Sequence, residues 1–104
     1  MDKTEKQADI FKALSDPTRL RLVKLLNECE PGICSGGPLC VNALANRLGV
    51  TQSAVSQHLR ILRQAGLVRG ERRGSFMHYA LDPEGLDKCK TALRETLGEK
   101  FVTV

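Results

Sequence analysis

The chain has 104 residues, of which 27% are charged and 41% hydrophobic, and its formal net charge at pH 7 is +4. This length fits one domain with a modest core, to which contacts with a second copy could add much stability. No stretch approaches the roughly 18 consecutive apolar residues of a membrane span, and residues 1–10 lack the apolar segment of a signal peptide. We therefore expect residues 1–104 to form a single cytoplasmic domain with no membrane partner.

The charges are unevenly distributed along the chain. Residues 41–73 contain six arginines and one acidic residue, Glu71, a net charge of +5 in a chain whose total is +4. No acidic residue occurs between Val41 and Gly70. An amphipathic helix with a solvated polar face usually carries both signs of charge, so this segment is more typical of a surface that binds nucleic acid.

The first 28 residues have the pattern of two helices. Apolar residues at helical spacing predict a first helix from about Thr4 to Leu14. Ser15 and Asp16 interrupt it, and Pro17 suits the first position of a second helix that runs to about Glu28. Residues 29–38, CEPGICSGGP, are rich in glycine and proline and predict a loop.

Two further short helices follow this loop. The first ends near Leu48, because Gly49 is free to adopt the positive φ of a helix C-cap. The second has Thr51 as its N-cap. Apolar residues recur every three or four positions along both helices and predict buried stripes, formed by Val41, Leu44, Ala45 and Leu48 in the first and by Val55, Leu59, Leu62 and Ala65 or Gly66 in the second.

The polar positions of the second of these helices suit a DNA major groove, which requires short polar side chains for base edges and cations for phosphates. Residues 67–72 and 75–81 predict two strands around Arg73-Gly74, a basic hairpin that could lie on the phosphate backbone or in the minor groove. We expect DNA contacts from Gln52, Ser53, Ser56, Gln57, Arg60, Arg63, Arg72 and Arg73.

A last helix is predicted after the hairpin. Asp82 and Pro83 are suited to its start. Its apolar residues form one narrow stripe, which predicts packing against another helix; they are Leu86, Cys89, Leu93 and Leu97, continuing to Phe101.

Three segments together carry a family resemblance: ALSDPTRLRLVKLL at 13–26, LCVNALANRLGVTQSAVSQHLRILRQAGLV at 39–68 and RRGSFMHYAL at 72–81. They resemble the ArsR/SmtB family of bacterial and archaeal repressors, and the resemblance covers nearly the whole chain. It implies a mainly α winged helix-turn-helix fold with five helices and a two-stranded wing. It also implies a homodimer, joined by the first and last helices, that binds double-stranded operator DNA and releases it when a metal, metalloid or oxidant reaches a sensor site.

The candidate sensor residues are cysteines. Cys29, Cys34 and Cys40 lack the C-x2-C spacing of structural zinc sites, but three thiolates could converge on As(III), Sb(III) or another soft metal as inducer, with no cofactor required. Cys40 stands at the first cysteine of the family's Cys-Val-Cys metalloid motif, whereas Asn42 replaces the second. The family's metal site on the last helix is not matched, because Thr96 stands where a histidine is needed.

The same thiols permit different chemistry. Cys40 could form a regulatory disulfide with Cys34 or Cys29, or it could be a buried residue in a repressor without an inducer. A small thiol enzyme using Cys34 and Cys40 is the alternative from another class, but no Cys–His or paired-carboxylate pattern near these cysteines supports it, so we expect no enzyme. Cys89 is expected in the core, His78 in a structural role, and His58 either near a phosphate or flanking the core.

Overall fold

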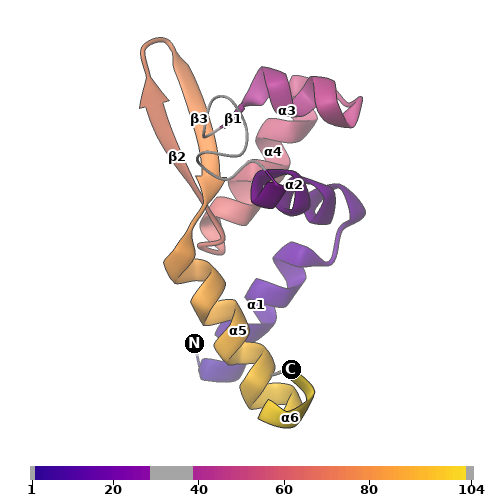
Figure 1. Cartoon of the computed structure of the whole chain (residues 1–104), viewed down its shortest axis with the longest axis vertical. Helices are drawn as coiled ribbons and strands as arrows, with labels where there is room; N and C mark the ends of the chain where they lie inside the picture. The colour runs from indigo at the N-terminus through magenta and orange to yellow at the C-terminus, as the bar shows by residue number, and fades with distance from the viewer. Residues whose placement is uncertain (1, 29–38, 103–104) are drawn as a thin grey trace.

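The computed structural model describes residues 2–28 and 39–102. Figure 1 shows a winged helix-turn-helix fold from which two helices extend as an arm. The elements, in chain order, are α1 (Lys3–Leu14), α2 (Pro17–Glu28), β1 (Leu39–Cys40), α3 (Val41–Leu48), α4 (Gln52–Gln64), β2 (Val68–Arg73), β3 (Phe76–Leu81), α5 (Pro83–Leu97) and α6 (Glu99–Val102). The predicted fold class, mainly α with a β-hairpin wing, is confirmed.

The turn between α3 and α4 has the predicted chemistry. Gly49 ends α3 with φ +67°, and its N–H donates to the Ala45 carbonyl. The Thr51 hydroxyl accepts a hydrogen bond from the Ala54 N–H at 3.2 Å and so caps α4. These two residues fix a short, sharp connection, which holds α3 and α4 in the arrangement of a DNA-binding helix pair.

The wing belongs to a three-stranded antiparallel sheet of order β1-β3-β2. The β2–β3 register runs from Val68 opposite Leu81 to Arg73 opposite Phe76, so the turn is centred one residue later than predicted, at Gly74-Ser75. The sequence did not predict β1, whose two residues form a strand only by pairing with β3. In that pairing Cys40 lies opposite His78.

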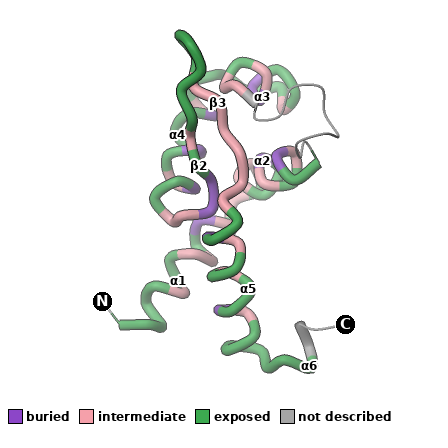
Figure 2. Tube along the Cα trace, turned by 60° about the vertical axis from the view of Figure 1, so that its left-hand side comes forward, coloured by how far each residue is buried: buried purple, intermediate pink, exposed green. Residues whose placement is uncertain are grey.

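The hydrophobic core fills the space between α2, α3, α4 and the base of the hairpin, where Figure 2 shows most of the buried residues. Its largest fully buried side chains are those of Leu22, Leu44, Val55, Leu59, Leu62 and Leu67. The stripe predicted for the second helix of the pair is therefore confirmed at its first three residues, while Ala65 and Gly66 lie beyond the end of α4 and are half-buried. Burial of this stripe orients α4 with its polar residues outward.

Helices α1 and α5 lie side by side in the arm. The Lys3 ammonium and the Gln7 amide donate to the two carboxylate oxygens of Glu95 at 2.8 and 2.6 Å. The predicted continuation of the last helix to Phe101 is wrong, because Gly98 adopts φ +88° and ends α5, and the short α6 follows. Among the described residues, none of the helices is both long and apolar enough to cross a membrane.

Asp16 joins α1 to α2 and offers a test of this corner. Its carboxylate accepts a hydrogen bond from the Arg19 N–H at 3.0 Å, and this bond lowers the pKa of Asp16. The ionised carboxylate therefore stabilises the fold above the unfolded-chain pKa of about 4, and the contribution is lost as the pH falls through the lower folded-state pKa. As the pH is lowered from about 5 to about 2, we expect the Tm of Asp16→Asn to fall less than the Tm of the wild type.

Thermal unfolding followed by circular dichroism at several pH values measures this difference. The control is Asp87→Asn on the exposed surface of α5, which should follow the wild-type pH dependence. Equal losses of Tm in the wild type and in Asp16→Asn would show that the Asp16 carboxylate has no such role.

Candidate nucleic-acid interface

Helix α4 presents one continuous polar face to solvent. While Val55, Leu59 and Leu62 are fully buried, the polar side chains at the intervening positions are exposed. Neutral side chains occupy the first half of the helix, two arginines follow, and a glutamine ends it: Gln52, Ser53, Ser56, Gln57, Arg60, Arg63 and Gln64. The structure thus places all six residues predicted on this helix on its outer face.

Two adjoining hollows lie along this face. One, of about 450 Å³, is lined by Ser53, Ser56, Gln57 and Arg60. The other, of about 600 Å³, is lined by Ser56, Arg60, Arg63, Gln64 and Tyr79. They share Ser56 and Arg60, so they form one groove between α4 and the wing, which we call the α4 groove. Its shape and its cationic and hydroxyl lining suit a phosphate backbone next to a base edge.

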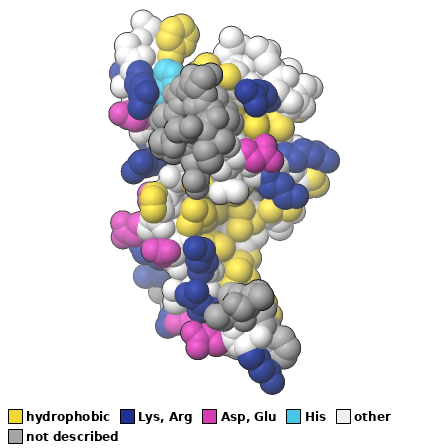
Figure 3. Space-filling view, viewed as in Figure 1, with side chains coloured by type: hydrophobic (Ala, Val, Ile, Leu, Met, Phe, Trp, Pro, Cys, Tyr) yellow, Lys and Arg dark blue, Asp and Glu magenta, His cyan; other side chains and the backbone are white. Residues whose placement is uncertain are grey.

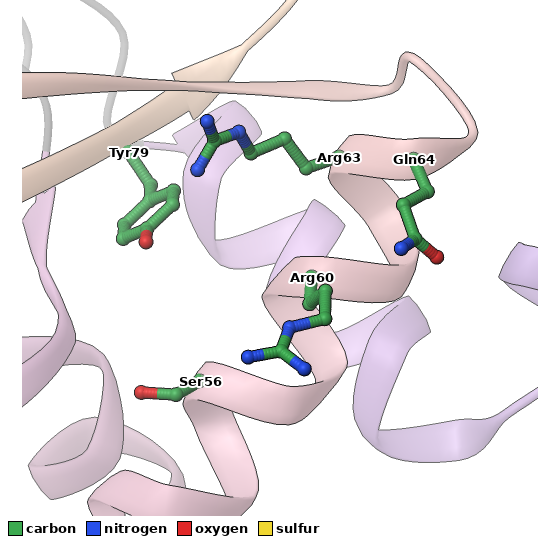
Figure 4. Close-up of a pocket in the computed structure, with 5 residues that line it drawn as sticks. All are labelled: Ser56, Arg60, Arg63, Gln64 and Tyr79. Atoms are coloured by element: carbon green, nitrogen blue, oxygen red, sulfur yellow. The ribbon is translucent and has the colours of Figure 1, made fainter.

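Figure 4 shows how the wing completes this groove. The ring of Tyr79, from β3, lies beside the guanidinium of Arg63, with Arg60 and Ser56 on turns nearer the start of α4. Gly70 lies opposite Tyr79 in the hairpin and leaves room for both side chains. A Cβ atom at Gly70 would lie 3.3 Å from Tyr79 Cε1, 3.7 Å from an Arg63 guanidinium nitrogen and 2.8 Å from Met77 Cε.

Sequence reasoning selected neither Tyr79 nor Gly70 for the site. The available signal was a glycine within a strand, which often marks a close approach of other groups. The helix contacted by that strand depends on tertiary packing, so the sequence alone could not assign Tyr79 to the α4 groove.

The close packing around Gly70 provides a prediction for the α4 groove. Gly70→Val should displace the Met77 and Tyr79 side chains, which lie closest to the added Cβ, reduce DNA affinity, and destabilise the fold by about 1–3 kcal/mol through overpacking. Tyr79 is the single tyrosine of the chain, so protein labelled with fluorotyrosine gives one ¹⁹F resonance that reports on the groove. We expect this resonance to shift in Gly70→Val and on addition of DNA to the wild type. An unchanged resonance in both experiments would contradict this geometry.

Gln52 is held by the helix that precedes it. Its side-chain amide donates to the Asn42 carbonyl oxygen at 2.8 Å, which joins the first turns of α3 and α4. The Gln52 carbonyl oxygen and its second N–H stay available for a base edge. Asn42, which replaces a cysteine of the family's metalloid motif, therefore positions Gln52 at the start of α4.

The wing adds a second group of cations. Arg69, Arg72 and Arg73 are exposed on β2. One guanidinium nitrogen of Arg73 lies 3.4 Å from a Glu71 carboxylate oxygen, a long contact between two well-exposed groups that contributes little and is screened by salt. Both predicted wing arginines therefore remain accessible to phosphates.

The predicted sensor residues are only partly described. Cys29 and Cys34 lie outside the described residues. Cys40 is half-buried at the start of α3, and its side chain makes no capping hydrogen bond. Across residues 2–28 and 39–102, no three His, Cys, Asp or Glu side chains gather into a group that could hold a metal ion.

The other cysteine and the two histidines lie apart from the α4 groove. Cys89 packs against the core, as predicted, and burial raises the pKa of its thiol. His78 lies in β3, and its buried Nδ1 atom has no hydrogen-bond partner among the described residues. His58 is half-buried on α4, with Nδ1 3.2 Å from a guanidinium nitrogen of Arg19, so the structure supports flanking of the core over phosphate contact.

Comparison with known proteins gives a consistent assignment. Residues 16–69 match the family described as bacterial regulatory protein, arsR family. An HTH-type transcriptional regulator of Methanocaldococcus jannaschii is 42% identical over 76% of this chain and 81% of its own length. The arsenical resistance operon repressor of Escherichia coli is 40% identical over 71% of this chain and 57% of its own length.

A solved structure extends this likeness to the whole fold. It is the homodimeric winged helix-turn-helix DNA-binding domain of a protein from Mycobacterium bovis, 25% identical, with a TM-score of 0.69 over 94% of this chain and 83% of that one. The fold, the basic α4 groove and these relatives agree, and the chain is a transcriptional regulator that belongs to the ArsR family.

Proposed function

We propose that this protein is a sequence-specific repressor that binds operator DNA as a homodimer, with α4 in the major groove and the β2–β3 wing on the adjacent backbone. The observation that carries the proposal is the exposed face of α4, on which two glutamines and two serines precede Arg60 and Arg63 and part of which lines the α4 groove. Short polar groups at the start of a recognition helix reach base edges, and cations farther along neutralise phosphates.

The roles of the side chains follow from their positions. Gln52, Ser53, Ser56 and Gln57 contact base edges and provide the sequence preference. Arg60 and Arg63 bind phosphates beside the groove, and Arg72 and Arg73 bind phosphates under the wing. Each phosphate contact releases a counterion, which makes the affinity strongly dependent on salt.

Dimer formation through α1 and α5 places two recognition helices on one face of the DNA. Figure 3 shows hydrophobic side chains gathered over the middle of the molecule on one face, near the arm that these helices form. Leu97 in α5 is 53% exposed, which a partner helix would cover. A twofold dimer implies a pseudo-palindromic operator with half-sites about one helical turn apart.

Regulation is proposed to act through Cys40 together with Cys29 and Cys34. Three thiolates suit As(III), Sb(III) or another soft metal, and the similar repressor from Escherichia coli carries arsenical resistance in its name. The replacement of a motif cysteine by Asn42 means that the remaining thiolates would have to come from residues 29–38. The alternative signal is oxidation to a disulfide between Cys40 and Cys34 or Cys29. The thiol of Cys40 is free and only half-buried, which supports this alternative.

Fluorescence anisotropy of reduced protein on a duplex from upstream of its own gene tests both parts of this proposal. We expect tight binding that collapses near one equivalent of arsenite, and no arsenite response when Cys29, Cys34 and Cys40 are all replaced by serine. Absence of specific binding would overturn the repressor assignment. Tight binding that responds to peroxide but not to arsenite would overturn the metalloid part in favour of the disulfide.

A further inference from the structure

Arg19, near the start of α2, connects three helices through a single guanidinium. Its Nε atom donates to the Ala13 carbonyl at 2.6 Å, and a terminal nitrogen lies 3.5 Å from the Lys12 carbonyl, so it binds the last turn of α1. The other terminal nitrogen lies 3.2 Å from His58 Nδ1 on α4. This contact links the end of the arm to the recognition helix.

The chemistry of the contact defines the direction of this hydrogen bond. Arginine can only donate hydrogen bonds, so in this contact His58 Nδ1 is the acceptor. The Asp16 carboxylate is 3.8 Å from the same Nδ1 atom and holds the backbone N–H of Arg19 at 3.0 Å. The α1–α2 corner thus holds the Arg19 end of the link.

Beside this contact the surface between α1 and α4 is hollowed. The hollow, of about 350 Å³, is lined by residues of both helices and by Arg19 itself: Asp9, Lys12, Ala13, Arg19, Ile61, Gln64 and Ala65. On its inner side the two helices share the core, in which Ala13 of α1 is buried together with Leu59 and Leu62 of α4. On the outer side the hydrogen bonds of Arg19 bridge α1 and α4.

We infer that Arg19 is a positioning residue for DNA recognition, which sets the orientation of α4 relative to the arm through His58. The inference rests on the proposed function, in which α1 and α5 join two protomers. In that dimer the orientation of α4 relative to α1 determines the separation of the two recognition helices. Arg19 thereby selects the half-site spacing of the operator without contacting DNA, since it does not line the α4 groove.

The test compares Arg19→Met, His58→Leu and the double variant on three duplexes: the operator, the operator with one base pair inserted between its half-sites, and an unrelated sequence. We expect each single variant to lose about tenfold in operator affinity, and the double variant to lose no more, because both changes break the same Arg19–His58 hydrogen bond. Discrimination against the altered spacing should decrease. Affinity for unrelated DNA and the salt dependence of binding should not change.

His58→Asn is the conservative control, because its side-chain oxygen can accept from Arg19 in place of Nδ1, and it should retain operator affinity and spacing preference. If Arg19→Met does not fold, Arg19→Lys keeps the charge but cannot bond α1 and His58 at once, and should behave as His58→Leu does. Additive losses, equal losses on all three duplexes, or a salt dependence reduced by one phosphate contact would overturn the inference. Failure of the wild type to bind any duplex would instead overturn the proposed function.

Discussion

Gly85→Ala is expected to destabilise the fold by roughly 3 kcal/mol or more, although alanine is the better helix former by about 1 kcal/mol. Gly85 is buried in the first turn of α5, and a Cβ atom there would collide with the backbone carbonyl of Gly66. Gly66 has φ +80° and connects α4 to β2, where the Asp82 N–H also donates to the Leu67 carbonyl. Backbone cannot rotate away as a side chain can, so the collision outweighs the gain in helix propensity.

Urea unfolding monitored by circular dichroism measures the loss. Lys90→Ala, on the exposed surface of the same helix, should remain within about 0.5 kcal/mol of the wild type. A stability of Gly85→Ala equal to that of the wild type would mean that α5 does not pack against this turn.

Arg60→Ala combined with Arg63→Ala is expected to weaken operator binding by roughly a hundredfold near 0.1 M salt, because two phosphate contacts are lost. The plot of log affinity against log salt concentration should become shallower by about 2 per protomer. Both side chains are exposed, so the fold should keep its stability.

Anisotropy titrations at several salt concentrations measure both quantities. Arg21→Ala combined with Lys24→Ala removes the same charge from exposed positions on α2, outside both the proposed DNA surface and the α1–α5 dimer contact, and should leave the slope unchanged. A double variant of α4 that bound with wild-type affinity and slope would place the DNA elsewhere on the surface.

Local patterns predicted most of the elements because those elements depend on nearby residues. The helix pair was predictable from its apolar spacing and from Gly49 and Thr51, which satisfy the backbone within a few residues. In contrast, β1 forms only because Leu39 and Cys40 pair with β3, about forty residues later in the chain. The end of α5 was missed because apolar residues at helical spacing continue in the sequence to Phe101, whereas the helix itself ends at Gly98, which adopts a positive φ.

The candidate site was predictable to the same extent. The outward direction of Ser56, Arg60 and Arg63 follows from burial of the opposite face of α4, which is a property of one helix. Tyr79 could not be assigned to the groove from the sequence, because its place depends on how the hairpin packs against α4. The Arg19–His58 link likewise joins residues of two helices that the sequence treats separately.

Asn42 occupies a motif position of the family but makes a structural hydrogen bond in this chain. In the family's metalloid motif a cysteine stands there, but in this chain the amide bonds Gln52 of the recognition helix. Asn42→Cys would restore the motif and remove the hydrogen bond together. Any variant of this position must therefore be assayed for DNA affinity as well as for arsenite response.

The salt dependence of wild-type affinity for its operator tests the central claim most directly. With four arginines per protomer on phosphates, a dimer should show a log–log slope near −7 between about 50 and 300 mM KCl, with far weaker binding to a scrambled duplex. An affinity that does not change with salt, or that is equal for operator and scrambled duplexes, would contradict the assignment of α4 and the wing as the operator-binding surface.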